Sequence, residues 1–309
     1  MYVAQRPSRS ETLPLRLHQY HVRLWGRPQP GTAPLVLVHG WMDVAASYQF
    51  MVEALDQRFL DGRLIIAPDW RGFGLTTGPA CDHYDFPDYL ADLDALLDHY
   101  VGDQPVDLVG HSMGGHVAMI YAGARPQRIR RLVNLEGFGM PAARAGQAPN
   151  RYAQWMDEIK SLHAGKLALK TYDDAAGVAA RLMKTNPRLP PDRAQWLAQV
   201  WARPQIGDDG TQRWAVLGDA AHRVINPHLF RVDEIEAVYS QITRPVLMVE
   251  GSDDSLGGWW KDRYTLAEFH QRLQAVPACQ RVVLPDSGHM LHHDQPVALA
   301  KLIEEFLAG

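Results

Sequence analysis

Short apolar runs that alternate with helix-like stretches are the feature that most constrains the fold of this 309-residue chain. A segment at 15–26 alternates polar and apolar residues and predicts a leading antiparallel hairpin. Apolar strands separated by helices are typical of a parallel sheet covered on both faces. The sequence therefore predicts an α/β fold with a mostly parallel, eight-stranded sheet. Six further strands are expected at residues 34–40, 63–69, 106–112, 131–137, 244–251 and 280–289.

Helical periodicity fills most of the gaps between these strands. The last helical segment ends in glycine, as helices often do. We expect these helices to cover the two faces of the sheet. They are predicted at 47–59, 86–100, 265–276 and 295–309, and in the run that follows Ser112.

The alternation stops between about Met140 and Gln241, where the chain has helical segments and no clear strand. We expect a helical cap, inserted between the sixth and seventh strands, over the C-terminal edge of the sheet. The predicted domains are an α/β core, residues 1–139 and 241–309, and a cap, residues 140–240.

Composition narrows the class of partner. The hydrophobic fraction of 46% and the charged fraction of 21% are ordinary for a soluble globular protein. A net charge of −4, without blocks of like charge, argues against nucleic acid or an anionic membrane as partner. No apolar segment is long enough for a membrane span or a secretion signal. Cys81 and Cys279 suggest neither a metal cluster nor a disulfide framework. We expect a cytoplasmic protein with a small-molecule substrate.

One short motif carries chemistry. Gly110, Ser112 and Gly114 fit G-x-S-x-G at the end of a predicted strand and the start of a predicted helix. This is the context of a nucleophile elbow, in which a strained turn projects the serine hydroxyl from the sheet edge. The following helix N-terminus favours negative charge on a developing oxyanion. The motif predicts Ser112 as a nucleophile.

Five motifs in order extend this interpretation: VLVHGW (36–41), PDWRGFG (68–74), GHSMGG (110–115), VEGSDD (249–254) and DSGHM (286–290). With these motifs the chain resembles the α/β-hydrolase superfamily, in its serine esterase and lipase-like, cap-containing form. The resemblance covers residues 13–309 apart from the insertion. It implies a triad in the chain order nucleophile, acid, histidine.

A serine hydroxyl needs a base at neutral pH. The resemblance places the catalytic histidine at His289, in the Gly-His pair after the last strand. His292 and His293 lie close by and remain alternatives, although neither follows a glycine.

The base needs a carboxylate at its other ring nitrogen, and two strand ends offer one. The common pattern of the resembled family places the acid at Asp254, which we favour. Glu136, which lies after the sixth strand and 24 residues after Ser112, is the alternative acid. Asp253 is a third candidate.

Two backbone N–H groups are expected to form an oxyanion hole. One belongs to Met113, directly after the nucleophile. The resemblance assigns the second to Trp41 and gives His39 an orienting role. His111 and Phe73 are predicted to lie at the substrate pocket, while Asp69 and Arg71 are predicted to hold their loop.

Ser112 points to acyl transfer on an ester, thioester, lactone or amide through an acyl-enzyme. Epoxide hydrolases and haloalkane dehalogenases use an aspartate at this position. The sequence has no metal-binding motif, and no dinucleotide-binding G-x-G-x-x-G follows a strand. We therefore expect neither a metal nor a cofactor. The sequence predicts a serine hydrolase of carboxylesterase type. The alternatives are a C–C bond hydrolase of ring-cleavage products, a peptidase of the proline iminopeptidase type, and a non-catalytic binding protein.

Overall fold

The computed structural model describes residues 2–207 and 210–309. Its centre is an eight-stranded sheet with the order β1-β2-β4-β3-β5-β6-β10-β11. Strand β2 is antiparallel to both of its neighbours, and all other pairs are parallel. This confirms the predicted fold class. The strands are β1 (Arg9–Leu15), β2 (His18–Trp25), β3 (Leu35–Val38), β4 (Ile65–Pro68), β5 (Val106–His111), β6 (Ile129–Leu135), β10 (Val246–Gly251) and β11 (Cys279–Leu284).

The leading hairpin begins earlier than predicted. Its first strand is Arg9–Leu15, and the chain reverses at Arg16, which has a positive φ of 53°. The first four residues of β1 are exposed because β1 is an edge strand. Such a strand carries little of the apolar pattern on which the prediction depends.

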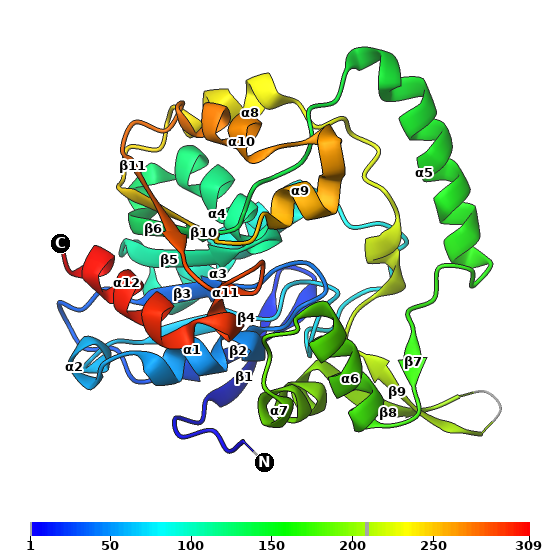
Figure 1. Cartoon of the computed structure of the whole chain (residues 1–309), viewed down its shortest axis with the longest axis horizontal. Helices are drawn as coiled ribbons and strands as arrows, with labels where there is room; N and C mark the ends of the chain where they lie inside the picture. The colour runs from blue at the N-terminus through cyan, green and yellow to red at the C-terminus, as the bar shows by residue number, and fades with distance from the viewer. Residues whose placement is uncertain (1, 208–209) are drawn as a thin grey trace.

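Successive residues of β3 serve the two layers of the core. Leu35 and Leu37 pack on one face with α1 (Gln49–Ala54) and α12 (Pro296–Ala308). Val36 and Val38 pack on the other face with the second helix layer. This is the alternation that a strand buried on both faces requires. The second layer is formed by α3 (Phe86–Val101), α4 (Met113–Ala124), α8 (Val232–Tyr239) and α10 (Leu266–Leu273), and Figure 1 shows α1 and α12 on the opposite side of the sheet from α4, α8 and α10.

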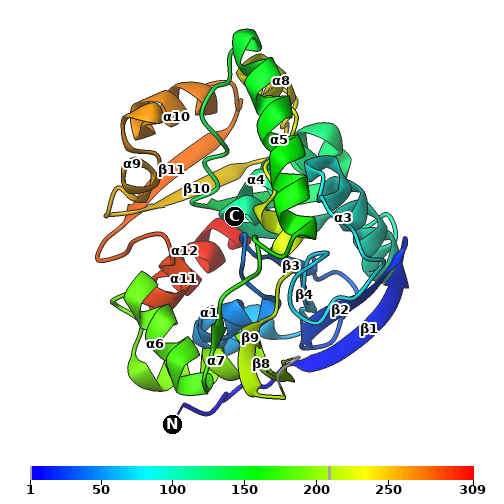
Figure 2. The ribbon, with the colours of Figure 1, turned by 90° about the vertical axis from the view of Figure 1, so that its right-hand side faces the viewer.

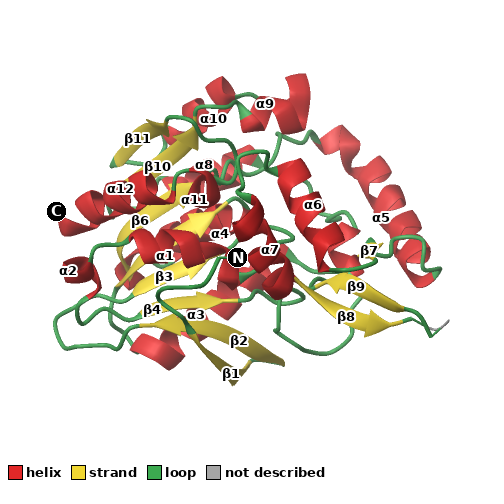
Figure 3. Ribbon diagram, turned by 60° about the horizontal axis from the view of Figure 1, so that its bottom comes forward, coloured by secondary structure: helices red, strands yellow, loops and turns green. Residues whose placement is uncertain are grey.

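The segment between β6 and β10 contains strands, which corrects the expectation of a purely helical insertion. Three strands form a separate antiparallel sheet with the order β7-β9-β8 (Figure 3). All but the first residue of β8 are exposed, so no buried apolar run marks it in the sequence. The elements are α5 (Ala148–His163), β7 (Thr171–Tyr172), α6 (Ala175–Thr185), α7 (Pro191–Trp201), β8 (Ala202–Ile206), β9 (Gln212–Val216) and α8.

The helices of the insertion differ in how they contact the core. α6 and α7 pack on Phe50 of α1 through a small apolar cluster of their own. α8 packs against α4 and α10 and therefore belongs to the core layer, although the predicted cap extends over it. α5 stands at the edge of the molecule (Figures 1 and 2), and none of its described residues is fully buried. No helix within the described residues is long and apolar enough to cross a membrane.

Candidate active site

Ser112 occupies a tight turn between β5 and α4. Its φ of 51° lies in the left-handed region, which is strained for a side chain other than glycine. The backbone N–H of Ser112 donates to the Leu135 carbonyl of β6 at 2.8 Å, which ties the turn to the next strand. A Cβ on Gly110 would lie 2.4 Å from the Gly114 oxygen, and one on Gly114 would lie 2.2 Å from the Val38 oxygen. The two glycines are therefore required by the close approach of strand and helix.

The same turn leaves the Ser112 hydroxyl available. Ser112 is the N-cap residue of α4, but its side chain makes no capping bond to any described residue of that helix. Met113 is the first residue of α4, so its N–H has no acceptor within the helix. The Ser112 hydroxyl and the Met113 N–H, neither of which bonds within α4, thus lie together at the N-terminus of this helix.

His289 contacts the hydroxyl. Its Nε2 lies 3.0 Å from Ser112 Oγ, and the imidazole is 34% exposed, so it is open to the solvent side of the site. Two hydrogen bonds fix the loop that carries it. The Gly288 N–H donates to Asp294 at 2.9 Å, and His111 Nε2–H donates to the His289 carbonyl at 2.8 Å.

Glu136 lies at the other ring nitrogen. Its Oε2 accepts a hydrogen bond from His289 Nδ1–H at 3.1 Å. The carboxylate is almost fully buried and also accepts from the Gly251 N–H at 2.7 Å and from the Ser255 hydroxyl. Glu136 directly follows β6 and has a φ of 55°. Three donors around one buried carboxylate hold it in place and hold the imidazole with it.

The geometry corrects the preference for Asp254 as the acid. Asp254 is exposed and caps α9 (Ser255–Trp260), where its Oδ1 accepts from the Gly257 N–H at 2.7 Å. Asp253 is also exposed and forms a bidentate ion pair with Arg188 at 2.6 and 3.1 Å. The alternative acid, Glu136, is the carboxylate that contacts His289.

The other candidate histidines have different partners. His292 and His293 both point their Nε2 atoms at the Ser47 hydroxyl, at 3.1 and 2.7 Å. His111 is 2% exposed, and burial holds the pKa of its imidazole well below the ordinary value. His111 therefore packs behind the serine and supports the loop of His289, and presents almost no surface to a substrate.

The loop after β3 approaches the serine. A Cβ on Gly40 would lie 3.0 Å from Ser112 Cβ, so the backbone that leads to Trp41 passes directly beside Ser112. His39 is fully buried and braces this loop. Its Nε2 accepts from the Trp70 N–H at 2.9 Å, and its Nδ1–H donates to the Gly40 carbonyl at 2.7 Å. Burial lowers the pKa of His39 to about 4, so the ring is neutral at physiological pH.

Phe73 lies in the core, which corrects its prediction as a pocket residue. It is 1% exposed and packs edge-on against His39. Its other side stacks on His222 of the insertion, with ring centroids 3.7 Å apart. Tyr84 stacks on His222 as well, at 3.9 Å. Phe73 thus joins the insertion to the core and has almost no exposed surface to offer a substrate.

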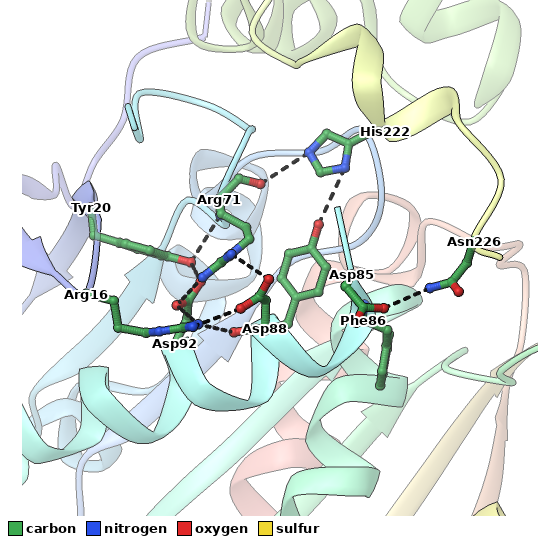
Figure 4. Close-up of polar contacts among 10 residues, drawn as sticks. Arg16, Tyr20, Arg71, Asp85, Phe86, Asp88, Asp92, His222 and Asn226 are labelled. Carbon is green, nitrogen blue, oxygen red and sulfur yellow. Dashed lines mark hydrogen bonds and ion pairs between the residues drawn. The ribbon is translucent and has the colours of Figure 1, made fainter. Parts of the chain in front are cut away.

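An ion-pair network surrounds Arg71, which lies two residues before Phe73 in the same loop, and Figure 4 shows its contacts. The Arg71 guanidinium binds both oxygens of Asp92, at 2.6 and 2.7 Å, and also Asp88 at 2.9 Å. The Tyr20 hydroxyl accepts from the Arg71 N–H at 3.1 Å and donates to Asp92. His222 donates from Nε2 to the Arg71 carbonyl at 3.2 Å, which extends the network into the insertion.

Two contributors to the site were not predicted. Ser255 contacts the Glu136 carboxylate. Asp43 lies behind the site with His111 and His292, within reach of both rings. Neither residue belongs to a motif, and their neighbours come from other strands, so no local sequence signal marks them.

Comparison with known proteins identifies the family. A family model described as the alpha/beta hydrolase fold matches residues 33–296. A serine hydrolase-like protein of Danio rerio is 25% identical over 307 residues, which cover 96% of this chain and 87% of that protein. The 2-(acetamidomethylene)succinate hydrolase of Mesorhizobium japonicum is 26% identical over 281 residues, which cover 90% of each chain.

A solved structure described as the thioesterase domain from the curacin biosynthetic pathway superposes with a TM-score of 0.77 at 25% identity. The superposition covers 96% of this chain and 99% of that chain. Because the family model spans most of the sequence and the sheet order and nucleophile elbow agree with it, this chain belongs to the α/β-hydrolase fold family.

Proposed function

We propose that this protein is a serine hydrolase that cleaves a carboxylic ester, or a related acyl compound, through an acyl-enzyme on Ser112. The observation that carries the proposal is the continuous chain from the Ser112 hydroxyl through His289 to Glu136, with contacts of 3.0 and 3.1 Å. This nucleophile, base and orienting acid form the arrangement that acyl transfer requires.

The contacts define the role of each nitrogen of His289. Because Nδ1–H donates to Glu136, the neutral ring presents its lone pair on Nε2 to the serine hydroxyl. Nε2 accepts the hydroxyl proton as Ser112 Oγ bonds to the carbonyl carbon of the substrate. The buried Glu136 carboxylate then stabilises the imidazolium that forms.

Two backbone N–H groups are proposed to donate hydrogen bonds to the oxyanion. We assign one to the Met113 N–H at the N-terminus of α4, and the other to the Trp41 N–H beside Gly40. One such donor contributes about 10²–10³ to the rate in serine hydrolases. The Trp41 side chain is 44% exposed and stays free to contact the substrate.

The second half of the reaction uses the same groups in reverse. The tetrahedral intermediate collapses, and His289 gives its proton to the departing alcohol or thiol. A water molecule, deprotonated by His289, then attacks the acyl carbon. The bond from that carbon to Ser112 Oγ breaks, the acid leaves, and His289 returns the proton to Ser112 Oγ. All steps use residues of this chain, so the proposed mechanism includes no cofactor.

The relatives support acyl-type hydrolysis without fixing the substrate. Their names include a succinate-derivative hydrolase and a thioesterase domain. We therefore propose a small acyl compound as the substrate. A cytoplasmic location remains a prediction from the sequence.

Labelling with a fluorophosphonate probe tests the nucleophile. The wild-type protein is expected to take up one probe per chain, and Ser112→Ala none. Ser240→Ala is the matched control, because Ser240 is exposed at the end of α8, where its hydroxyl donates to the Ala237 carbonyl and accepts from the neighbouring Gln241 side chain. A wild-type protein that is not labelled overturns the proposal in favour of a binding protein.

A substrate panel then separates the reaction classes. p-Nitrophenyl esters and acyl thioesters test the proposed activity, and a burst of product equal to the enzyme concentration identifies the acyl-enzyme. Aminoacyl nitroanilides and diketone ring-cleavage products test the peptidase and C–C hydrolase alternatives. Turnover of only the latter two replaces the esterase assignment while keeping the triad.

A further inference from the structure

A cluster of buried polar side chains lies directly behind the serine and histidine, and the proposed reaction does not use it. Asp43 follows β3, His111 ends β5, and His292 belongs to α11 (Leu291–Asp294). Each of the three offers one ligand atom, and these atoms lie within 4.8 Å of one another. Three elements far apart in sequence thus bring a carboxylate and two imidazoles to one point.

Each of the three side chains has one buried polar atom without a hydrogen-bond partner in the described part of the chain. Asp43 Oδ2, His111 Nδ1 and His292 Nδ1 are buried and have no hydrogen-bond partner among the described residues. The exposed fractions of these residues are 9%, 2% and 0%. Buried polar atoms without partners are rare and usually mark a missing water or ion.

One outer hydrogen bond orients His111 as a metal ligand. His111 Nε2–H donates to the His289 carbonyl, which leaves the Nδ1 lone pair directed away from that bond. A ring nitrogen fixed by a carbonyl, with the opposite nitrogen free, is the usual arrangement around a metal-bound histidine. His292 faces Asp43 through its Nε2, which lies 3.9 Å from Asp43 Oδ2 and 3.1 Å from the Ser47 hydroxyl.

We infer that Asp43, His111 and His292 form a binding site for one divalent transition-metal cation of the Zn²⁺ class. Two imidazoles and one carboxylate are a ligand set that Zn²⁺ accepts, with the fourth position left for water. Ligand atoms around a tetrahedral Zn²⁺ are ~3.4 Å apart, since its bonds are about 2.0–2.1 Å. Pairs near the 4.8 Å bound therefore move closer by up to about 1.4 Å on binding.

Such a cation would act on the neighbouring base. The ring centroids of His111 and His289 are 4.8 Å apart, so a bound cation is close to the ring that must become positively charged during the proposed reaction. Like charges at this range disfavour protonation. Zn²⁺ is expected to inhibit turnover, and a chelator to restore it. This consequence rests on the proposed function, whereas binding of the metal does not.

The binding experiment uses the full chain, stripped of metal with a chelator, and Zn²⁺ alone as the probe. Equilibrium dialysis with elemental analysis is expected to give one tightly bound Zn²⁺ per wild-type chain. Asp43→Asn, which keeps the shape and removes the charge, is expected to weaken binding at least 100-fold.

The controls separate this site from others. His163→Ala removes a histidine whose side chain is 66% exposed and is expected to leave the tight site intact. Co²⁺ in place of Zn²⁺ reports ligation through its visible absorption bands, which Asp43→Asn and His292→Asn should each abolish, so that one variant that fails to fold does not decide the test.

Three outcomes overturn the inference. If the wild-type chain binds no Zn²⁺, the unpaired atoms of the cluster bind a buried water instead. Binding that survives Asp43→Asn and disappears in His289→Ala places the metal on the catalytic histidine instead. Binding that falls with His163→Ala is adventitious surface binding. Because these readouts need no turnover, they stand even if fluorophosphonate labelling fails.

Discussion

The Glu136 carboxylate accepts a hydrogen bond from His289 across 153 positions of the chain. The sheet order explains the contact. β6 lies between β5 and β10, so its end is next to the turn of Ser112. Asp254 follows β10, which lies one strand farther from β5 than β6 does, and its side chain caps α9. The carboxylate nearest the nucleophile in the sheet is therefore the one that holds the histidine.

The first prediction concerns this acid. Glu136→Gln is expected to lower kcat/KM on a p-nitrophenyl ester by roughly 10⁴-fold, because the amide stabilises the wrong tautomer of the ring and cannot stabilise its positive charge. Asp254→Asn is the matched control and is expected to retain wild-type activity within about threefold. A larger loss of activity in Asp254→Asn than in Glu136→Gln would identify Asp254, after β10, as the orienting acid.

Ser255 is expected to position Glu136. Ser255→Ala removes one of three donors to the carboxylate while leaving the Gly251 N–H and His289 in place. We expect kcat to fall by about 10-fold with KM unchanged, since the loss affects the transition state and not substrate binding. Ser255→Thr keeps the hydroxyl and should restore most of the rate. If Thr is no better than Ala, the hydroxyl acts only through packing at the start of α9.

The reaction centre was more predictable than its acid. Ser112 and His289 lie in motifs that the sequence shows directly. Gly110 is required by a contact within the elbow, and Gly114 by its close approach to Val38 of the neighbouring strand β3. The choice between Glu136 and Asp254 depends on how two neighbouring strands end at one sheet edge. Glu136 directly follows β6, and Asp254 lies three residues after the end of β10, so each strand end offers a carboxylate. Local sequence reasoning favoured Asp254, whereas Glu136 is the one that contacts His289.

The insertion was less predictable than the core. The inner core strands β3, β4, β5 and β10 are buried along their whole length. By contrast, β8 and β9 have exposed or half-buried residues over most of their length and pair mainly with each other. Phe73 was misplaced for a related reason. Its partner His222 comes from the insertion, whose packing on the loop of residues 68–74 leaves no periodic signal in the sequence.

The buried network around Arg71 is expected to stabilise the folded protein. Asp92 is fully buried and accepts from Arg71, Arg16 and Tyr20. Asp92→Ala leaves the buried guanidinium without its bidentate partner, and such a loss costs about 3–5 kcal/mol of unfolding free energy. Urea unfolding measures it. Asp233→Ala, which breaks an exposed pair with Arg231, is the control and should change nothing measurable. Equal effects of the two variants would contradict this account.

Gly40 is expected to be intolerant of a side chain. A Cβ there would lie 3.0 Å from Ser112 Cβ and 3.1 Å from His111 Nδ1, so the loop has to move away from the nucleophile. Since the Trp41 N–H moves with it, we expect Gly40→Ala to lower kcat/KM by about 10²–10³-fold, the contribution of one oxyanion donor. Gly146→Ala, in open space, is the control. Wild-type kinetics in Gly40→Ala would contradict the assignment of the Trp41 N–H to the oxyanion hole.

Buried neutral histidines are expected to make the fold sensitive to mild acid. Burial lowers the pKa of His39, His116 and His293 from 6.5 to about 4. Between these values the unfolded chain binds protons that the folded chain excludes, so stability is complete above about pH 6.5 and is lost as the pH falls toward 4. Burial raises the pKa of Asp43 from 3.8 to about 7, which acts in the opposite direction but involves one group against several.

His116 allows this effect to be measured away from the reaction centre. Its ring packs between Phe86 and Phe230, at 4.9 and 5.5 Å, so His116→Phe replaces a titrating ring with an apolar one of similar shape. The unfolding free energy from urea titrations at about pH 5 and about pH 6 gives the slope, to which one such histidine contributes about 1.1 kcal/mol per pH unit. We expect His116→Phe to lower the slope by that amount and the exposed-site variant His163→Phe to leave it unchanged. A slope that His116→Phe does not alter would show that His116 is protonated equally in both states, and the acid sensitivity would then have to arise from the other buried histidines.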